Sequence, residues 1–475
     1  MSGFHYRPEV LEDMPEPLVK DLKKYDDMFT LDRERLRKIT DHFVQELEKG
    51  LSKEGGSIPM DITWVMKYPS GHEKGRFLTV DMGGTNLRVC EVELSTGKRD
   101  FEQTQRKSKL PEAVKRGTAE QLWDFIAEKV ESFLQEGHRN WEEGSYVFPL
   151  AFTFSFPVAQ RSIRSGILQR WTKNFKVSGV EGHDVVPQTG GRICPEGRKL
   201  PVKVVALVND TTGTLIASHY RDPQVKIGGI FSTGVNAAYM EDVRDVPKLR
   251  DSRLPEDATV VINTEYGAFD NERQVLPLTP LDHQLDQKSI RPGTQIYEKM
   301  ISGLYIGEML RLILVTLHEE GKLFRGLDIT RLQEENALEA SFLSAAELDF
   351  SEGLQDMRME FEECLSLSPE FPDLKICRYL IGLVASRAAR LYACGIAAIC
   401  KKKSFNRCHV GVDGSVFNKY SAFKSRAAQA LREIFDWPPG EVDLIVLNAS
   451  EDGSGLGAAL AAALVLEGEQ EAKPV

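Results

Sequence analysis

Apolar and polar residues follow two patterns along the chain, one with the spacing of a helix and one with that of a strand. Leu36, Ile39, Phe43 and Leu47 recur every three or four residues, which predicts an amphipathic helix over Asp32–Leu51. Shorter apolar runs, bounded by glycine or polar residues, predict strands. Strands are expected at Arg76–Leu94 (two, around Gly83-Gly84), Tyr146–Pro157, Lys203–Val208, Ile227–Phe231, Ala237–Glu241, Thr259–Asn263 and Val442–Leu447, and further helices at Ala119–Gln135, Thr211–His219, Thr294–Glu319 and Ile376–Lys401.

Units made of a strand hairpin and a helix occur twice, near residues 80 and 230. Such repetition indicates an α/β protein built from two related lobes. A strand-turn-helix unit over His409–Phe435 and an alanine-rich C-terminal helix complete the pattern. No low-complexity linker separates the units, so short hinges are predicted near residues 70, 210 and 448.

Composition narrows the classes of protein to consider. At about 150 residues per domain, 475 residues make two or three domains. With 60 basic and 71 acidic residues, the net charge of −11 disfavours binding to nucleic acid or to a membrane surface. The apolar run Leu380–Cys400 carries Arg387 and Arg390, which argues against a membrane span. The seven cysteines include no CxxC pair and the N-terminus is unlike a secretory signal, so a cytoplasmic protein is expected.

Several predicted strands end in turns that combine an acid or hydroxyl with glycine. In such turns backbone N–H groups can approach a phosphate closely. The turns are Asp81-Met82-Gly83-Gly84-Thr85-Asn86, Ser232-Thr233-Gly234, Asp413-Gly414-Ser415 and Glu451-Asp452-Gly453-Ser454-Gly455-Leu456-Gly457. Asp81 can hold Mg²⁺ or its waters; the alternative is a plain hairpin turn with an exposed acid. No GK[ST] follows, which excludes a P-loop, and no βαβ unit follows Gly457, which excludes a dinucleotide fold.

A second group of polar residues lies among aromatic ones, in Phe152–Pro157 and in Trp171-Thr172-Lys173-Asn174-Phe175. Apolar rings and polar edges together suit a sugar. Lys173 can also stabilise charge on a transferring phosphoryl group. The alternative is that the rings belong to the core and Lys173 extends to water.

Asn209-Asp210 follows the apolar strand Lys203–Val208, where an α/β sheet places ligand-facing residues. A carboxylate at this place can accept a hydroxyl proton while the oxygen attacks phosphorus. The alternative is that Asp210 only caps the next helix. Asn236 can meet a sugar hydroxyl. Glu265 and Glu298 are acids in apolar settings that can accept hydrogen bonds from sugar hydroxyls, or else lie at the surface.

Taken in order, these motifs resemble the eukaryotic hexokinase family, from about Phe29 to Leu464. The length and Leu456 in the last glycine turn make the chain most similar to a fungal glucokinase. The resemblance implies a two-lobed actin-like ATPase (ribonuclease H-like) fold with a central cleft. It implies a small lobe of residues 72–208 plus 449–466 and a large lobe of residues 1–71 plus 209–448.

The resemblance also implies a role for each matching residue, with Asp210 as the catalytic base and Lys173 as a second catalytic group. Glucose is expected to contact Ser155, Thr172, Lys173, Asn209, Asp210, Asn236, Glu265 and Glu298. ATP is expected to contact Asp81, Met82, Gly83, Gly84, Thr85, Asn86, Arg88, Lys107, Thr233, Gly303, Asp413, Gly414, Ser415, Val416, Gly453 and Ser454. No residue is expected to bind a metal directly, because ATP carries the Mg²⁺, with Asp81 reaching it through water.

Three residues depart from the family pattern. Ser232 stands where the family usually has glycine, Asn174 replaces a glycine after Trp-Thr-Lys, and Tyr266 replaces a tryptophan. None of the three removes a catalytic group. They bear on nucleotide affinity and turnover rate and leave the type of reaction unchanged.

The resemblance therefore implies ATP-dependent phosphorylation of the 6-hydroxyl of glucose, or of a hexose such as mannose or fructose, as the first step of glycolysis. Small-molecule partners, a sugar and Mg-ATP, and a monomer or weak homodimer are expected. One alternative is a catalytically weak sugar sensor, suggested by Ser232. Another is an actin- or chaperone-like ATPase without sugar chemistry, which has no need for Ser155, Lys173 and Glu298.

Overall fold

The computed structural model of the protein describes residues 16–95, 99–137, 147–172, 175–193, 200–438, 440–451 and 453–471. The described strands are β1 (Asp61–Ile62), β2 (Gly75–Met82), β3 (Asn86–Leu94), β4 (Phe101–Lys109), β5 (Phe148–Phe154), β6 (Val158–Ser162), β7 (Ser165–Leu168), β8 (Val202–Val208), β9 (Val225–Phe231), β10 (Val235–Asp242), β11 (Thr259–Asn263), β12 (Cys408–Asp413) and β13 (Ile445–Ala449). The described α-helices are α1 (Glu16–Phe29), α2 (Arg33–Leu51), α3 (Glu112–Lys115), α4 (Ala119–Gly137), α5 (Val185–Ile193), α6 (Asp210–Arg221), α7 (Pro280–Lys288), α8 (Ile296–Ile301), α9 (Gly303–Glu319), α10 (Thr330–Gln333), α11 (Ala340–Leu348), α12 (Gln355–Leu365), α13 (Phe371–Lys402), α14 (Ser415–Lys419), α15 (Ser421–Phe435) and α16 (Gly453–Glu471).

Two mixed sheets organise the molecule, and they share one strand order. The first sheet runs β4-β3-β2-β5-β8, with three antiparallel strands followed by two parallel ones. In the second sheet, β11-β10-β9-β12-β13 repeats that order and β1 extends the edge beside β11. This repeated order confirms the expected two-lobed ribonuclease H-like α/β fold.

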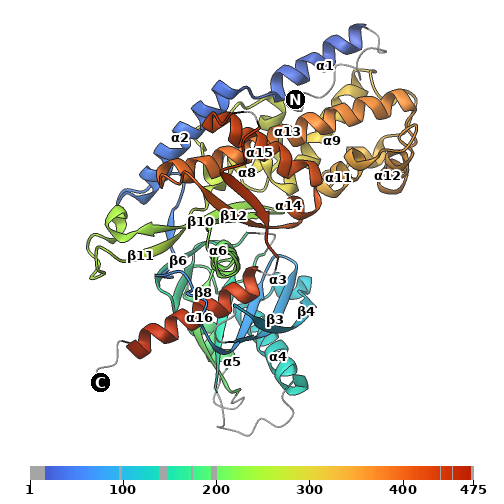
Figure 1. Ribbon diagram of the computed structural model, residues 1–475. Coiled ribbons are helices and arrows are strands. Elements are labelled where there is room, and N and C mark those ends of the chain that lie inside the picture. Colours follow the sequence, from blue (N-terminus) through green and yellow to red (C-terminus); the bar gives the residue numbers. More distant parts are fainter. Residues whose placement is uncertain are drawn as a thin grey trace.

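We call the part of the chain around the first sheet the small lobe and the part around the second sheet the large lobe (Figure 1). The large lobe carries most of the helices, including α2, α9, α13 and α15, and the small lobe carries α4 and α5. The expected boundaries of the lobes at residues 72, 208 and 449 remain predictions.

The two faces of β5 pack against two different cores, which explains why its residues are apolar on both faces. Phe152 packs in the same core as Trp123 of α4, with ring centroids 6.3 Å apart. Its neighbour Ala151 points to the opposite face, into a core that contains Leu460 of α16. Successive side chains of a strand face opposite sides, so a strand covered by helices on both sides is a continuous apolar run.

The helices α6 and α16 lie between the two sheets (Figure 1). Together they form an apolar core with strands of both lobes, which includes Leu215, Leu456 and Val261. Where the two helices cross, a β-carbon added to Gly457 would overlap the backbone of Gly213. The backbones therefore touch without a side chain between them, and glycine is required at the crossing.

Two expectations about element boundaries are corrected. The helix expected over Thr294–Glu319 is two helices, α8 and α9, because the chain turns at Ser302 so that the Gly303 N–H donates to the Ser232 carbonyl at 2.8 Å. The strand expected from Val442 begins at Ile445, and Val442 is exposed. Both differences follow from long-range contacts that local patterns do not contain.

Among the described helices, α13 is long and apolar enough to cross a membrane by length and composition alone. Of its most apolar window, 89% is buried inside the protein. Arg387 and Arg390 on this helix have acidic partners, Asp282 and Glu433. The helix is therefore the central core helix of the large lobe.

Candidate active site

Asp210 lies at the N-terminus of α6, directly after the end of β8. The capping role that we considered for Asp210 belongs to Asn209, whose side chain accepts the Thr211 N–H at 2.9 Å. Asp210 is the first residue of the helix and is partly buried. Its carboxylate accepts the same Thr211 N–H at 2.8 Å. A helix N-terminus favours a negative charge, which suits an ionised carboxylate at this place.

A network of amides and one acid connects Asn209 to Glu265. The Thr211 hydroxyl bridges Asn209 and the side-chain carbonyl of Asn263, at 2.9 Å from the latter. Asn236 donates to that same oxygen at 2.8 Å and to the Glu265 carboxylate at 3.0 Å. Asn263 also donates to Glu265 at 2.9 Å. The structure thus brings together three of the predicted sugar residues, which come from segments more than 50 positions apart in places.

Glu298, on α8, belongs to the same neighbourhood. Its carboxylate accepts the N–H of Val235, the residue before Asn236, at 3.0 Å. A β-carbon on Gly234 would lie 2.8 Å from that carboxylate, and one on Gly267 would lie 3.1 Å from the Glu298 β-carbon. The two glycines therefore leave the room that the Glu298 side chain occupies, next to the turn after Glu265.

The predicted sugar residues of the small lobe follow β5 and an aromatic cluster. Ser155 comes directly after β5, whose parallel neighbour β8 ends just before Asn209, so both lie at the same edge of the sheet. Trp171, the residue before Thr172, packs edge-on against Phe156, with ring centroids 4.9 Å apart. Lys173 and Asn174 lie outside the described residues, so their predicted roles stay predictions.

On the phosphate side, Asp81 lies one residue before the end of β2 and is held by two partners. Arg88 donates to the Asp81 carboxylate at 2.7 Å, and the Ser454 hydroxyl donates to the same oxygen at 2.9 Å. Arg88 also donates to Ser454 at 2.9 Å. Ser454 is in the first turn of α16, and its carbonyl accepts from Thr153 of β5 at 3.2 Å. The first and last glycine turns of the sequence are therefore neighbours in space.

The other glycine turns meet in the large lobe. The Gly303 N–H donates to the Ser232 carbonyl, and Leu304 donates to the Thr233 carbonyl at 3.3 Å. Gly414 has φ +138°, a conformation that side chains rarely adopt, and lies against Phe231. A β-carbon on Gly303 would lie 2.6 Å from the side chain of Val416. Three separate segments with predicted nucleotide residues thus converge.

The Asp413 carboxyl interacts electrostatically both with residues of the glycine turns and with Asp210 at the N-terminus of α6. Burial raises the pKa of the Asp413 carboxyl above its ordinary value, and the nearby Asp210 acts in the same direction. Arg88 and the N–H groups of Gly453 and Gly414 offset part of this rise in pKa. The carboxylate of Asp413 is therefore within electrostatic reach of both Asp210 and Arg88.

The remaining predicted nucleotide residues lie on the first hairpin or beside it. Lys107 of β4 is directly opposite Arg88 in the ladder, so the two side chains share one face of the sheet. Between the strands, the Gly83 N–H donates to the Asn86 carbonyl at 3.1 Å, and the Thr85 carbonyl accepts from Leu110. Met82 is buried. In the turn itself, Gly83 and Gly84 are half-buried and Thr85 is exposed.

Two of the departures from the family pattern have a structural context. The Ser232 hydroxyl lies 3.0 Å from the Ser415 hydroxyl, so it contacts a predicted phosphate residue. Tyr266 is buried and packs edge-on against Phe43 and Tyr297, with ring centroids 5.7 and 5.5 Å away. Its ring therefore supports Glu265 from the core.

The sequence did not single out three contributors to this site. Thr211 and Asn263 complete the amide network; an asparagine that ends an apolar strand was the available signal for Asn263. Asp61, which pairs with Asn263 in the sheet, is the third. Burial raises the pKa of Asp61 to about 7; the Glu265 carboxylate adds to the rise, and Lys248 and Arg170 oppose it.

One acidic cluster outside this site also has the spacing to hold a metal ion. Glu241, Asp242 and Asp245 bring their oxygens within 4.8 Å of one another. Glu241, however, forms ion pairs with Lys402 at 2.7 Å and with Lys403 at 2.5 Å. The ammonium groups thus occupy the place of a cation, and the cluster joins the end of α13 to β10.

The fold and the arrangement of the site are those expected of a phosphoryl-transfer enzyme, with glycine turns and a network of amides and acids near the partly buried carboxylate of Asp210. Two sequence models described as Hexokinase match residues 21–220 and 226–464. A hexokinase of Emericella nidulans is 52% identical over 459 residues, which are 96% of this chain and 93% of that protein. A solved structure of a hexokinase from Schistosoma mansoni complexed with glucose is 36% identical, has a TM-score of 0.85, and covers 94% of this chain and 99% of its own. The chain therefore belongs to the hexokinase family, enzymes that transfer a phosphoryl group from ATP to a hexose.

The comparisons also refine the expected similarity to a fungal glucokinase. A glucokinase of Aspergillus niger is 37% identical over 467 residues, which are 91% of this chain and 94% of that protein. The hexokinase of Emericella nidulans is considerably more similar. The chain thus has more in common with a fungal protein named hexokinase than with one named glucokinase.

Proposed function

We propose that the protein phosphorylates the 6-hydroxyl of glucose with Mg-ATP and that Asp210 is the catalytic base. The observation that carries this proposal is the position of Asp210, at the N-terminus of α6. It follows Asn209, which begins the amide network, and it lies within electrostatic reach of Asp413 on the phosphate side. Asp210 is therefore next to both expected substrates.

Each group of residues has its own task in the proposed reaction. Asn209, Asn236, Glu265 and Glu298 bind the hydroxyls of the sugar, and Ser155, Thr172 and Lys173 bind it from the small lobe. Asp210 accepts the proton of the 6-hydroxyl as the hydroxyl oxygen attacks the γ-phosphorus, the bond from that phosphorus to the bridging oxygen breaks, and ADP leaves. Lys173 stabilises the transferring phosphoryl group. Closure of the lobes excludes water from the γ-phosphate.

The carboxylates on the phosphate side fit a Mg-nucleotide. Asp81 and Asp413 offer the hard oxygen ligands that Mg²⁺ and its waters prefer. Burial and Asp210 raise the pKa of Asp413, so a cation at this place relieves an unfavourable concentration of negative charge. When bound, Mg²⁺ neutralises charge on the β- and γ-phosphates. The turns around Gly83, Thr233, Gly414 and Gly453 supply N–H groups to the phosphates.

The first experiment measures ADP release with Mg-ATP and glucose, mannose, fructose or no sugar. We expect fast turnover with glucose and little without sugar. Comparable rates with fructose would make the protein a hexokinase of broad specificity. Glucose binding without sugar-stimulated turnover would instead favour the sugar sensor that the Ser232 hydroxyl suggests.

The role of Asp210 is tested with Asp210→Asn. We expect kcat to fall by about 10²- to 10⁴-fold, the range of general-base catalysis, because the amide cannot accept the hydroxyl proton. The Thr211 N–H retains an acceptor, so glucose binding by calorimetry and the circular dichroism spectrum should stay close to wild type. A kcat near the wild-type value would remove Asp210 from the mechanism.

We further propose that the protein is a cytoplasmic monomer or weak homodimer. The acidic composition supports a location in solution rather than on membranes or nucleic acid. Sedimentation velocity over a hundredfold range of concentration tests the oligomeric state. A stable larger assembly at the lowest concentration would contradict the proposal.

A further inference from the structure

The loop between α7 and α8, residues 289–295, reaches from the large lobe to the small lobe. At its tip, the Arg291 guanidinium donates to the backbone carbonyl of Trp171 at 3.0 Å. Trp171 immediately precedes Thr172 and Lys173, which the proposed function assigns to the sugar and the phosphoryl group. The contact therefore joins the large lobe to the segment of the small lobe that bears these two residues.

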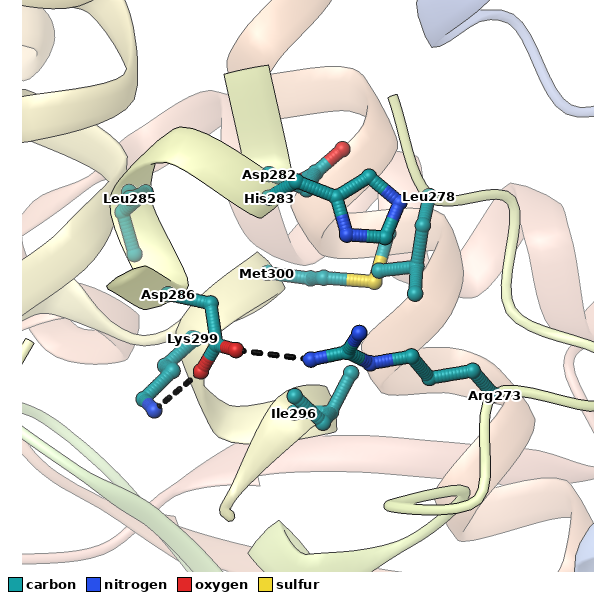
Figure 2. A pocket seen from close by; sticks show the side chains of 9 residues that line it. All are labelled: Arg273, Leu278, Asp282, His283, Leu285, Asp286, Ile296, Lys299 and Met300. Carbon is teal, nitrogen blue, oxygen red and sulfur yellow. Dashed lines mark hydrogen bonds and ion pairs between the residues drawn. The ribbon is translucent and has the colours of Figure 1, made fainter. Parts of the chain in front are cut away.

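The base of this loop is fixed by a buried acid, Asp286 (Figure 2). Asp286 accepts from Lys299 at 2.6 Å, from Arg273 at 2.8 Å and from the Gly293 N–H at 3.0 Å. Burial by itself raises the pKa of Asp286, but these donors outweigh burial and hold it below its ordinary value. The ionised carboxylate of Asp286 therefore binds Gly293 within the loop and Lys299 on α8, the helix that follows the loop.

Lys299 also connects Asp286 to Arg291. Its ammonium, 6% exposed, donates to Asp286 and also to the Arg291 carbonyl at 2.7 Å. Lys299 follows Glu298 on α8, and Glu298 is a predicted sugar residue. One short helix therefore fixes both a sugar carboxylate and the arginine that reaches across to the small lobe.

On the other side of the contact, Trp171 is also held by residues of the small lobe. Its backbone N–H donates to Glu181 at 2.5 Å, and its indole N–H donates to the Val177 carbonyl at 2.8 Å. Its ring stacks on Phe175, with centroids 5.3 Å apart. The carbonyl accepts from the other lobe, so Trp171 is positioned by both.

We propose that Arg291 is a positioning residue: its hydrogen bond to the Trp171 carbonyl fixes the position of Thr172, the next residue, relative to the sugar when the two lobes are together. In this role Arg291 acts through Trp171. The inference rests on the proposed function, because the role of the Thr172-Lys173 segment comes from it. A charged donor is involved, so the contact is stronger than an average hydrogen bond.

The test compares Arg291→Gln, Arg291→Lys and the control Lys288→Gln. Lys288 is exposed and immediately precedes the loop, and among the described residues its ionic partner is Glu335, 4.0 Å away. Its substitution thus removes the same charge close by without a contact between the lobes. We expect Arg291→Gln to lower kcat/KM for glucose about tenfold, as for loss of a charged hydrogen bond worth roughly 1.4 kcal/mol.

Three further results separate positioning from a general structural role. In Arg291→Gln, the dissociation constant of ATP measured without sugar and the melting temperature should stay at wild-type values. Arg291→Lys should recover part of the lost kcat/KM, and Lys288→Gln should lose less than twofold. An Arg291→Gln enzyme with unchanged kcat/KM, or a loss equalled by Lys288→Gln, overturns the proposal.

Failure of the proposed function gives a different result. In that case the wild-type protein binds glucose but shows no sugar-stimulated turnover. Calorimetry of glucose binding then tests Arg291 directly. A dissociation constant for glucose raised several-fold in Arg291→Gln and not in Lys288→Gln supports the contact, and equal constants in all three proteins refute it.

Discussion

Asp61 and Asp413 are two acids whose pKa is raised by burial, at opposite sides of the candidate site. Near Asp61 lies the Glu265 carboxylate, and near Asp413 lies Asp210. In each case a second acid adds to the rise in pKa. The candidate site thus concentrates carboxylates. The pKa of a single carboxyl group there depends on neighbours that are distant in the sequence, which the sequence alone does not reveal.

Asp61 gives a prediction about pH. Its pKa is about 7 in the folded protein and near 3.8 when unfolded, so its contribution to stability is complete below pH 3.8 and is lost as the pH rises to about 7. Asp61→Asn keeps the neutral form. At pH 8 we expect the variant to be more stable by about 1–2 kcal/mol, allowing for the partial exposure of the side chain.

Urea unfolding between pH 4 and pH 8 measures this effect. The advantage of Asp61→Asn should grow from pH 4 to pH 7 and stay constant above. Asp251→Asn, at an exposed acid paired with Lys53, serves as the control without such growth. An advantage that is independent of pH would show that Asp61 is ionised in the folded protein throughout.

At the scale of elements, α13 joins segments that are far apart in the sequence. Its Arg387 forms two hydrogen bonds to Asp282, at 2.8 and 2.9 Å, and Asp282 caps α7 with Thr279. The guanidinium also lies 4.2 Å from the ring centre of Phe29 at the end of α1. One buried arginine thus holds three helices in place.

Loss of this arginine should be costly. We expect Arg387→Leu to lower the free energy of unfolding by about 3–5 kcal/mol, because Asp282 is left as a buried charge without its cation. The matched control is Lys401→Leu on the same helix, which breaks the exposed pair with Asp41 and should change stability by less than about 1 kcal/mol. Urea unfolding followed by circular dichroism compares the two; equal effects would contradict the argument.

The elements show how far a sequence can be interpreted. The hairpins β2–β3 and β9–β10 were predicted because their alternation and glycine turns are local. The break between α8 and α9 was missed, because it depends on the Ser232 carbonyl some 70 residues away. Likewise the candidate site residues were proposed from local motifs and stay predictions, whereas the bridging positions of Thr211 and Asn263 depend on pairing between distant segments.

At the scale of the whole molecule, the large lobe and the small lobe each have a core, and α6 and α16 form a third core with both. Apolar contacts of this kind connect the stability of one lobe to that of the other. We therefore expect a single thermal transition rather than one for each lobe. Its dependence on glucose provides the test.

Glucose at 100 times its dissociation constant should stabilise the protein by about 2.7 kcal/mol, provided that it binds only the folded state. Scanning calorimetry should show one transition that moves as a whole to higher temperature. A non-binding sugar alcohol at the same concentration controls for the effect of the solute. Two transitions, of which glucose shifts one, would indicate that the lobes unfold separately.

The crossing of α6 and α16 at Gly213 and Gly457 bears on how quickly the molecule changes shape. Backbone meets backbone at this point, so no side chain stands between the two helices where they cross. Side-chain repacking is the step that makes packed interfaces bistable and slow to rearrange. The crossing therefore acts as a pivot, and we infer that the lobes open and close on the microsecond-to-millisecond timescale of hinge motions. The lifetime of the closed state is then set by the affinity for the substrates and not by repacking of side chains at the crossing.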